Sequence, residues 1–500
     1  MTVTFMKTRQ EISRFALCIM AGILSGGGIL LDAPLKWKAG SLAAFATAVL
    51  MLIAGRPRRI LLLMLAFTTP FYFGKALIRR PEHLGLASGV GVSHTDILVL
   101  ALLLLFSVKL ALGQIEARFF TLITVPALAW LIFSSFSILA AGDGELVAFQ
   151  LISMGQMLLL CWVVANSIEN KVDVTWVITG FMLAMLFQAF VGIYQGATGH
   201  PLGLGFLTET AEVHKQELSV GLVSRVQGTL GHPNSYAMYL MTVIPFLLGF
   251  LFSKTRLLFK VLAGIMVCIG ILALVFSLSR SAWINLLVII CIVLVLATRR
   301  KRIGLQAAIR LAGATALVLF GLSLFGPRII LSRLTSPDQG SAYVRITLAQ
   351  TALAVIKDHP WVGVGLNNYS VVVPKYGAPL FGHSPLVHNA FLLIAAETGV
   401  VGLIPFLGFL AVLLIQTWRI IKSAPNDTVW VAGVGLFSAF VALALHSMTD
   451  YALLGSLVFT QFWLLAGLSA ALIRPPQIED QYTKHVYRGS NTMDRGFHSY

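Results

Sequence analysis

Long apolar runs, separated by short polar clusters, occupy almost the whole of this 500-residue chain. A helix needs about 20 residues to cross the hydrocarbon core of a bilayer, and the runs approach or reach that length. The pattern therefore predicts an all-α fold, a polytopic transmembrane helical bundle of about 12–14 spans. The expected spans, of which the second and third are short, lie near residues 14–31, 40–54, 60–73, 95–112, 119–140, 146–165, 174–196, 233–253, 257–277, 281–298, 307–325, 400–418, 428–447 and 452–473.

The basic residues stand in small clusters beside the apolar runs. Cytoplasmic loops of membrane proteins carry an excess of Lys and Arg. With the N-terminus inside, this rule is largely satisfied, and both termini are expected in the cytoplasm. The cytoplasmic connections then hold Arg56, Arg58 and Arg59; Arg118; Lys171; Lys254 and Arg256; Arg299, Arg300, Lys301 and Arg302; and Arg419 and Lys422.

The composition agrees with a membrane protein, because 57% of the residues are hydrophobic and only 11% are charged. In soluble domains about a quarter of the residues are charged. The clusters beside the spans explain the net charge of +16, so nucleic acid is not an expected partner. The four cysteines lie within apolar runs and have neither metal-ligand nor disulfide spacing. They are Cys18, Cys161, Cys268 and Cys291.

Two connections, both on the periplasmic side, are too long to be simple turns, and long loops often carry function. The second loop is basic and has apolar residues at helical spacing, which predicts an amphipathic helix that holds Arg345 on a rigid element. This helix should contain Val344, Leu348, Ala352 and Val355 and end at Asp358-His359-Pro360. The expected organisation is residues 1–325 with spans 1–11 and the first loop near 197–232, residues 326–399 as a large periplasmic catalytic loop, residues 400–473 with the last three spans, and residues 474–500 as a disordered cytoplasmic tail.

Four short motifs follow one another between residues 225 and 399. They are Arg225-Val-Gln-Gly-Thr-Leu-Gly-His-Pro-Asn234, Ser279-Arg280-Ser281, Arg345 followed by Asp358-His359-Pro360-Trp361-Val-Gly363-Val-Gly365, and His388-Asn389 before Glu397-Thr-Gly399. In these motifs, their order and the place of the large loop, roughly residues 200–450 resemble the O-antigen ligase and polymerase superfamily. The first 150 residues resemble it only as generic spans.

The resemblance implies a glycosyltransferase of the bacterial inner membrane, multi-pass, with its active site facing the periplasm. It would transfer a glycan from undecaprenyl diphosphate to a hydroxyl of a second glycan or of lipid A-core, surrounded by membrane lipid. No metal, nucleotide or other cofactor is expected. A polysaccharide-export or chain-length protein would be a further partner.

Arg225 and Arg280 are the expected catalytic cations, because a guanidinium binds phosphate oxygens bidentately and stays charged. Arg280 begins a helix between two serines, where backbone N–H groups can face an anion. The alternative for Arg280 is an arginine that snorkels to the membrane interface. His388 is the expected acceptor base, since a neutral imidazole accepts a proton near physiological pH. The alternative is that His388 only orients the acceptor.

Four further residues are expected to bind substrate: Arg345, His383, His446 and Asp450. His446 and Asp450 have the i, i+4 spacing of one helix face, and the alternative for them is a cap or an interface pair. His232 is interpreted as a turn residue, and Gly363 and Gly365 as positions that serve backbone geometry.

Two other functions compete with this interpretation. Asp143-Gly144-Glu145 has the spacing of a metal-binding motif in other glycosyltransferases, although a turn between two helices explains it equally well. A transporter or flippase of lipid-linked glycans is the non-enzyme alternative, but no inverted repeat is evident. Within the resemblance, the number of spans and the absence of closely paired histidines favour a repeat-unit polymerase slightly over a ligase.

Overall fold

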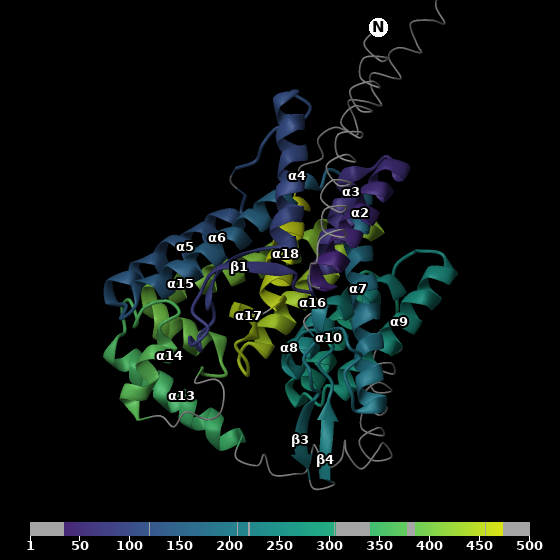
Figure 1. Cartoon of the computed structure of the whole chain (residues 1–500). Coiled ribbons are helices and arrows are strands. Elements are labelled where there is room, and N and C mark those ends of the chain that lie inside the picture. The colour runs from purple at the N-terminus through teal and green to yellow at the C-terminus, as the bar shows by residue number, and fades with distance from the viewer. Residues whose placement is uncertain are drawn as a thin grey trace, which may run out of the picture.

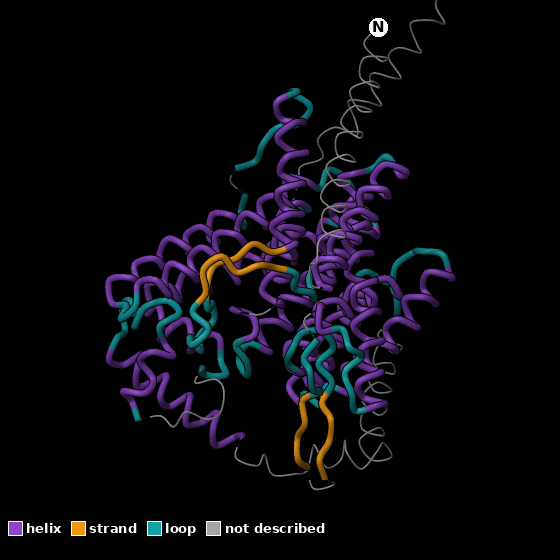
Figure 2. Tube along the Cα trace, in the orientation of Figure 1, coloured by secondary structure: helices purple, strands orange, loops and turns teal. Residues whose placement is uncertain are grey.

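The computed structural model describes residues 35–304, 306, 341–377 and 386–473, apart from residues 120, 208, 219, 220 and 456. Within these ranges the chain is a bundle of helices with two short antiparallel hairpins (Figure 1, Figure 2). The predicted all-α fold is therefore confirmed. The expected spans near 14–31 and 307–325, and the expected tail 474–500, lie outside the described residues.

Apart from two helices in the predicted large loop, the described helices follow the predicted apolar runs in order. Those before the second hairpin are α2 (Leu35–Ala54), α3 (Pro57–Thr68), α4 (His94–Ala111), α5 (Thr124–Ser135) with a 3-10 extension (Phe136–Ala140), α6 (Gly144–Ser167) and α7 (Lys171–Thr198). Those after it are α8 (Pro233–Leu251), α9 (Leu257–Phe276), α10 (Arg280–Arg299), α13 (Ser341–Asp358), α14 (Tyr369–Val372), α15 (Ala390–Ser423), α16 (Asp427–His446), α17 (Ala452–Gly455) and α18 (Leu457–Ala471).

Eight of the described helices are long and apolar enough to cross a membrane: α4, α6, α7, α8, α9, α10, α15 and α16. The combined α5 segment and α18 are apolar but shorter. The chain is thus a multi-pass membrane protein.

Helix α8 is the most enclosed of the eight, with 89% of its most apolar window buried, against 33% for α9. It packs against α9, α10 and α16, and the side chains of Tyr236 and Tyr239 are fully buried. A span surrounded by other helices can carry polar groups that lipid would disfavour. This explains why its mean hydropathy is 1.4 while that of α9 is 2.6.

Ion pairs link the predicted cytoplasmic connections to one another. Arg58 and Arg59 at the start of α3 both donate to Asp173 in the first turn of α7, at 2.7 and 2.8 Å, and Lys109 at the end of α4 pairs with Glu169. A second group forms where α10 ends and α16 begins, with Arg302 paired to Asp427 and Arg300 over the Trp430 ring. The first group thus joins three of these connections and the second joins two, as expected if they lie on a common side of the bundle.

Both hairpins lie in connections between spans. Strands β3 (His214–Leu218) and β4 (Gly221–Arg225) pair within the expected loop 197–232. Strands β1 (Gly74–Arg79) and β2 (Gly89–Ser93) pair in the connection between α3 and α4, which runs across the middle of the bundle in Figure 2. The sequence pattern predicts only two long connections, and this one is a third. Its short, glycine-rich strands do not alternate clearly, so the pattern did not distinguish them from the end of a span.

The predicted amphipathic helix is confirmed as α13. Leu348, Ala352 and Val355 are buried, whereas Arg345 is exposed on the same helix. The helix ends at Asp358, as expected. It rests against α15, so the exposed face with Arg345 is held in a fixed direction.

Candidate active site

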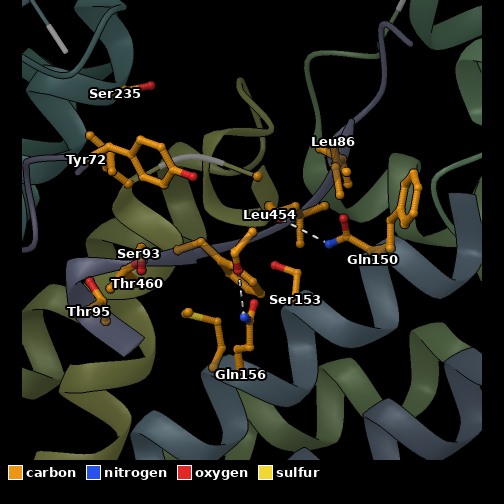
Figure 3. Close-up of a pocket in the computed structure, with 18 of the residues that line it drawn as sticks. Tyr72, Leu86, Ser93, Thr95, Gln150, Ser153, Gln156, Ser235, Leu454 and Thr460 are labelled. Carbon is orange, nitrogen blue, oxygen red and sulfur yellow. Dashed lines mark hydrogen bonds between the residues drawn. The ribbon is translucent and has the colours of Figure 1, made fainter. Parts of the chain in front are cut away.

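A cavity of about 670 Å³ lies between the β1–β2 connection, α6, and the segment from Asp450 through α17 into α18 (Figure 3). Its volume is within the range of about 300–1,000 Å³ that is usual for ligand pockets. Leu230, Gly231 and His232 of the first loop motif open onto it, together with His388 and Asp450. The cavity therefore joins the first loop motif, the start of α15 and the end of α16.

His388 is held beside the end of α16 by the residues that follow it. Asn389 is the N-cap of α15, and its side chain accepts hydrogen bonds from the N–H groups of Phe391 and Leu392. Its amide nitrogen donates to the Met448 carbonyl at 3.1 Å, and the Ala390 N–H donates to the Ser447 carbonyl at 2.8 Å. Asn389 therefore fixes the position of His388, because it begins the helix and attaches it to the segment that carries Asp450.

The environment of His388 favours the neutral imidazole. Burial lowers the pKa of His388 below its ordinary value, Asp450 opposes this shift, and Arg345 adds to it. Its Nδ1 atom has no hydrogen-bond partner in the described part of the chain, and its ring lies 5.5 Å from that of Tyr451. A neutral histidine at a cavity wall can accept a proton or orient a hydroxyl.

Asp450 is the charged centre of the group. Asn234 donates to Asp450 Oδ2 at 2.8 Å. Burial would raise the pKa of Asp450, but His232, His446 and His388 together with the Asn234 hydrogen bond hold it below its ordinary value. Asp450 is therefore an ionised carboxylate among three imidazoles.

His232 has a larger part in the site than the turn interpretation gave it. It is the N-cap of α8, and its Nδ1 accepts from the Asn234 N–H at 3.2 Å, so a neutral ring carries its proton on Nε2. The ring is open to the cavity but surrounded by protein. Burial lowers the pKa of His232 to about 4, and Asp450 partly opposes this. The sequence signal was present, since His-Pro-Asn at a helix start is a capping pattern, but it gave no indication of the cavity.

Arg225 and Arg280 are brought together by the turn between α9 and α10. Arg225 is buried, and its Nε donates to the Ser277 carbonyl at 3.0 Å. The Val226 N–H donates to the Phe276 carbonyl in the same turn. Leu278 adopts a positive φ of 53°, a conformation that bulky residues rarely adopt and that costs free energy. Arg225 thus anchors the turn from which Arg280 begins α10.

Arg225 also connects this turn to the cavity. Its Nη2 donates to Asn234 Oδ1 at 3.2 Å, and Asn234 in turn donates to Asp450. Arginine, asparagine and aspartate therefore form a hydrogen-bonded chain. Asn234 ends the first sequence motif, but its bridging role cannot be derived from the sequence because Asp450 is 216 positions away.

The other predicted binding residues differ in position. His446 is fully buried, and within the described residues neither ring nitrogen has a hydrogen-bond partner. Arg345 is exposed on α13 but near enough to influence the pKa of His388. His383 lies outside the described residues. Asp450 lies beyond the end of α16, so it and His446 belong to a helix end and the following turn rather than to one helix.

The Asp143-Gly144-Glu145 segment has the structure of a helix cap. Asp143 is the N-cap of α6 and accepts from the Glu145 and Leu146 N–H groups. Arg80 pairs with Asp143 and, at 2.7 Å, with Glu145. No group of three or more His, Cys, Asp or Glu side chains that could hold a metal was found among the described residues. The turn interpretation accounts for this segment.

The glycine motifs lie where residues 361–365 of the large loop contact residues 397–401 of α15. This backbone contact is called the support of the site. Gly363 and Gly399 have φ values of 68° and 60°, and Gly399 marks a kink inside α15. The Gly365 N–H donates to the Glu397 carbonyl at 3.0 Å, and the Val401 N–H donates to the Trp361 carbonyl at 3.1 Å. A Cβ on Gly399 would lie 2.2 Å from the Trp361 carbonyl oxygen. These glycines allow two backbones to touch, which agrees with the expectation that Gly363 and Gly365 serve backbone geometry.

Two asparagines that the sequence analysis did not select attach this support to the cavity. Asn367 is fully buried. Its Oδ1 accepts from the Leu86 N–H at 2.8 Å, and its Nδ2 donates to the Leu146 carbonyl at 3.1 Å. Asn368 accepts from the Asp143 N–H at 2.8 Å. The large loop thus fixes both the β1–β2 connection and the start of α6.

Residues 265–407 match the model of a protein family described as O-antigen ligase. The matched segment includes Arg280, Arg345 and His388 and the glycine motifs. It covers less than a third of the chain and supports the superfamily to which the sequence motifs point. No curated protein matches the chain.

Proposed function

We propose that this chain belongs to the O-antigen ligase and polymerase superfamily and transfers a glycan from undecaprenyl diphosphate to an acceptor hydroxyl at the periplasmic face of the inner membrane. The observation that carries the proposal is that the matched family segment contributes His388 to a cavity whose Asp450 is hydrogen-bonded, through Asn234, to Arg225. This hydrogen-bonded link supports a role for His388 as the base and for Arg225 as a cationic anchor beside the cavity.

The arginines would serve the leaving group. In the transfer, the bond between the anomeric carbon and the diphosphate oxygen breaks, and its electron pair stays on the phosphate. Arg280 stands at the N-terminus of α10, where the guanidinium and the helix end both favour an anion. Arg225 positions this turn through the Ser277 carbonyl. Charge that develops in the transition state is then met by groups already in place.

The acceptor hydroxyl would lose its proton to His388 as its oxygen forms the new bond to the anomeric carbon. Neutral His388 has this capacity, and the ionised Asp450 close to it would stabilise the imidazolium that results. This transfer uses neither a metal ion nor a redox partner. The protein's own residues supply the base, the counter-charge and the cations.

The acceptor distinguishes the two activities within the superfamily. A polymerase uses a second lipid-linked repeat unit, and a ligase uses lipid A-core. We favour the polymerase for this chain, from its number of apolar runs and the five-residue spacing of His383 and His388.

The lipid-linked material that accumulates after removal of the protein tests the proposal. Single repeat units on undecaprenyl diphosphate are expected for a polymerase, whereas complete polymers on the same lipid indicate a ligase. Purified protein in lipid nanodiscs should also join the two substrates with release of undecaprenyl diphosphate. Movement of the lipid-linked glycan across vesicles without a new glycosidic bond would contradict transfer and favour the transporter.

A further inference from the structure

The cavity wall formed by α6 differs in chemistry from the end that carries the histidines. Gln150, Ser153 and Gln156 follow one another at three-residue spacing, so they lie on one face of α6, and all three line the cavity. Figure 3 shows them on the same side of the helix, with Thr460 of α18 on another wall. A polar stripe on a membrane-crossing helix is costly unless it faces a partner or a cavity.

The two glutamines of this wall are fixed in orientation. Gln150 Nε2 donates to the Leu454 carbonyl at 3.4 Å, and Gln156 Nε2 donates to the Gly91 carbonyl at 3.3 Å. Each amide is thereby held to a different wall, α17 in one case and strand β2 in the other. Preorganised amides of this kind can donate to and accept from a ligand without first losing side-chain freedom.

The charges around the cavity favour an uncharged ligand over an acidic one at this wall. Among the described residues that line the cavity, none is Lys or Arg, whereas Asp96 and Asp450 are both present. Asp96 is held in the capping box of α4, where it accepts from the Ser93 N–H and Oγ, both at 2.7 Å. An anionic group here would meet carboxylates and no cation, which is unfavourable in a site of low dielectric constant.

Uncharged sugars match the amide and hydroxyl side chains of this wall. Their hydroxyls donate and accept equally, as amides and hydroxyl side chains do. Tyr72 and Tyr451 add aromatic rings to the lining, and such rings offer apolar faces with a polar edge. The arginines that would hold a diphosphate are not among the lining residues, so the diphosphate and the sugar chain would occupy different parts of the site.

We propose that the α6 wall, defined by Gln150, Ser153 and Gln156, is a specificity subsite that binds an uncharged sugar of the lipid-linked glycan. The inference rests on the proposed function and adds the substrate class. The three residues lie outside the matched family segment 265–407, so the subsite can select a glycan while the shared segment performs the transfer.

Binding to purified full-length protein in nanodiscs tests the subsite. The probes are undecaprenyl diphosphate alone, the same lipid carrying an uncharged hexose trisaccharide, and the same lipid carrying a trisaccharide with one uronic acid. Ser153→Trp fills the wall and should weaken binding of the uncharged glycolipid at least tenfold, while binding of undecaprenyl diphosphate stays unchanged. Leu159→Trp is the matched control, because Leu159 is on the same helix, 38% exposed, and not part of the cavity lining.

Gln156→Ala gives a milder version of the same test and should raise KM for the uncharged glycolipid without a comparable change in kcat. Wild-type protein should prefer the uncharged glycolipid to the uronic acid form. Equal binding of the two glycolipids, or an unchanged affinity in Ser153→Trp, would overturn the subsite and leave the proposed function intact. Failure of the wild type to bind any of the three lipids would instead contradict the proposed function itself.

Discussion

The Arg225 guanidinium donates from Nε to the Ser277 carbonyl at 3.0 Å, and this bond joins the two arginine motifs of the chain. Ser277 lies three residues before Arg280, in a turn that includes the strained Leu278. A turn that stores strain keeps its shape only where neighbours hold it. Arg225 therefore holds the turn from which Arg280 begins α10, in addition to contributing its own positive charge.

From this relationship we expect Arg225→Lys and Arg280→Lys each to lower the transfer rate about a hundredfold, because lysine cannot make the bidentate contact. The double variant should lose little more than either single variant, since the two residues act as a unit. Rates are measured with purified protein and normalised to its membrane abundance. Arg256→Lys, an exposed site next to α9, is the control and should retain wild-type activity. Full activity of Arg280→Lys would support a snorkelling arginine instead.

The pH dependence of transfer should report the surroundings of His388. Because the pKa of His388 lies below the ordinary histidine value, the rate should be constant at neutral pH and fall only when the pH drops below about 6.5. Asp450 raises this pKa and Arg345 lowers it. Asp450→Asn should therefore move the acidic limb of the profile to lower pH, and Arg345→Gln should move it to higher pH.

His232 also titrates in this group, so the profiles are compared with that of a His232→Asn variant, which keeps a helix cap. His388→Ala should lower the rate about a hundredfold or more and abolish the limb. An acidic limb that persists in His388→Ala would assign the titration to another group and remove His388 as the base.

Local patterns predicted most of the helices, because spans and amphipathic helices depend on nearby residues. Helix α13 ends at Asp358 as expected from its periodicity and the following His359-Pro360. The site depends on contacts that span the chain. Asn234 meets Asp450, and Asn367 meets Leu86. No periodicity reports such pairs, so the sequence assigns His232 to a turn and gives no indication of the cavity. The β1–β2 hairpin is local, but its short, glycine-rich strands lack the alternation that would predict it.

Sidedness is a separate prediction. The basic connections should face the cytoplasm, and the face that carries α13 should face the periplasm. A cysteine at Ser341, in a variant without the four native cysteines, should react with a membrane-impermeant maleimide in intact cells. Lys422→Cys is the control and should react only after the inner membrane is opened. The opposite labelling of the two positions would invert the topology and place the site in the cytoplasm.

The kink of α15 offers a test of the support beneath the site. Gly399→Ala places a Cβ against the Trp361 carbonyl at a φ of 60°, so we expect it to cost roughly 3 kcal/mol of stability. Gly408→Ala on the same helix is the control, because a Cβ there meets nothing within 4 Å. Thermal unfolding in detergent compares the two. A similar Tm for both variants would show that the contact with Trp361 does not hold the helix in its kinked form.

The final prediction is that transfer needs no divalent metal. Asp143 and Glu145 are the local acidic pair that suggested one, and Arg80 pairs with both carboxylates. A cation there would have to displace the guanidinium and compete with the helix cap, in which Asp143 accepts two N–H groups. Carboxylate ligands used in this way are poorly available to Mg²⁺ or Mn²⁺.

We therefore expect purified protein to keep its transfer rate in excess chelator. The double variant Asp143→Asn, Glu145→Gln should also stay within about threefold of the wild type, since asparagine preserves the N-cap and exposed ion pairs contribute little to stability. His388→Ala, measured in parallel, supplies the contrast because it should be about a hundredfold slower. Loss of activity in chelator, with recovery on adding Mg²⁺ or Mn²⁺ and full activity of His388→Ala, would place the chain in the metal-dependent class. In that outcome the leaving diphosphate would be neutralised by a cation, and Arg225 and Arg280 would keep only their structural contacts.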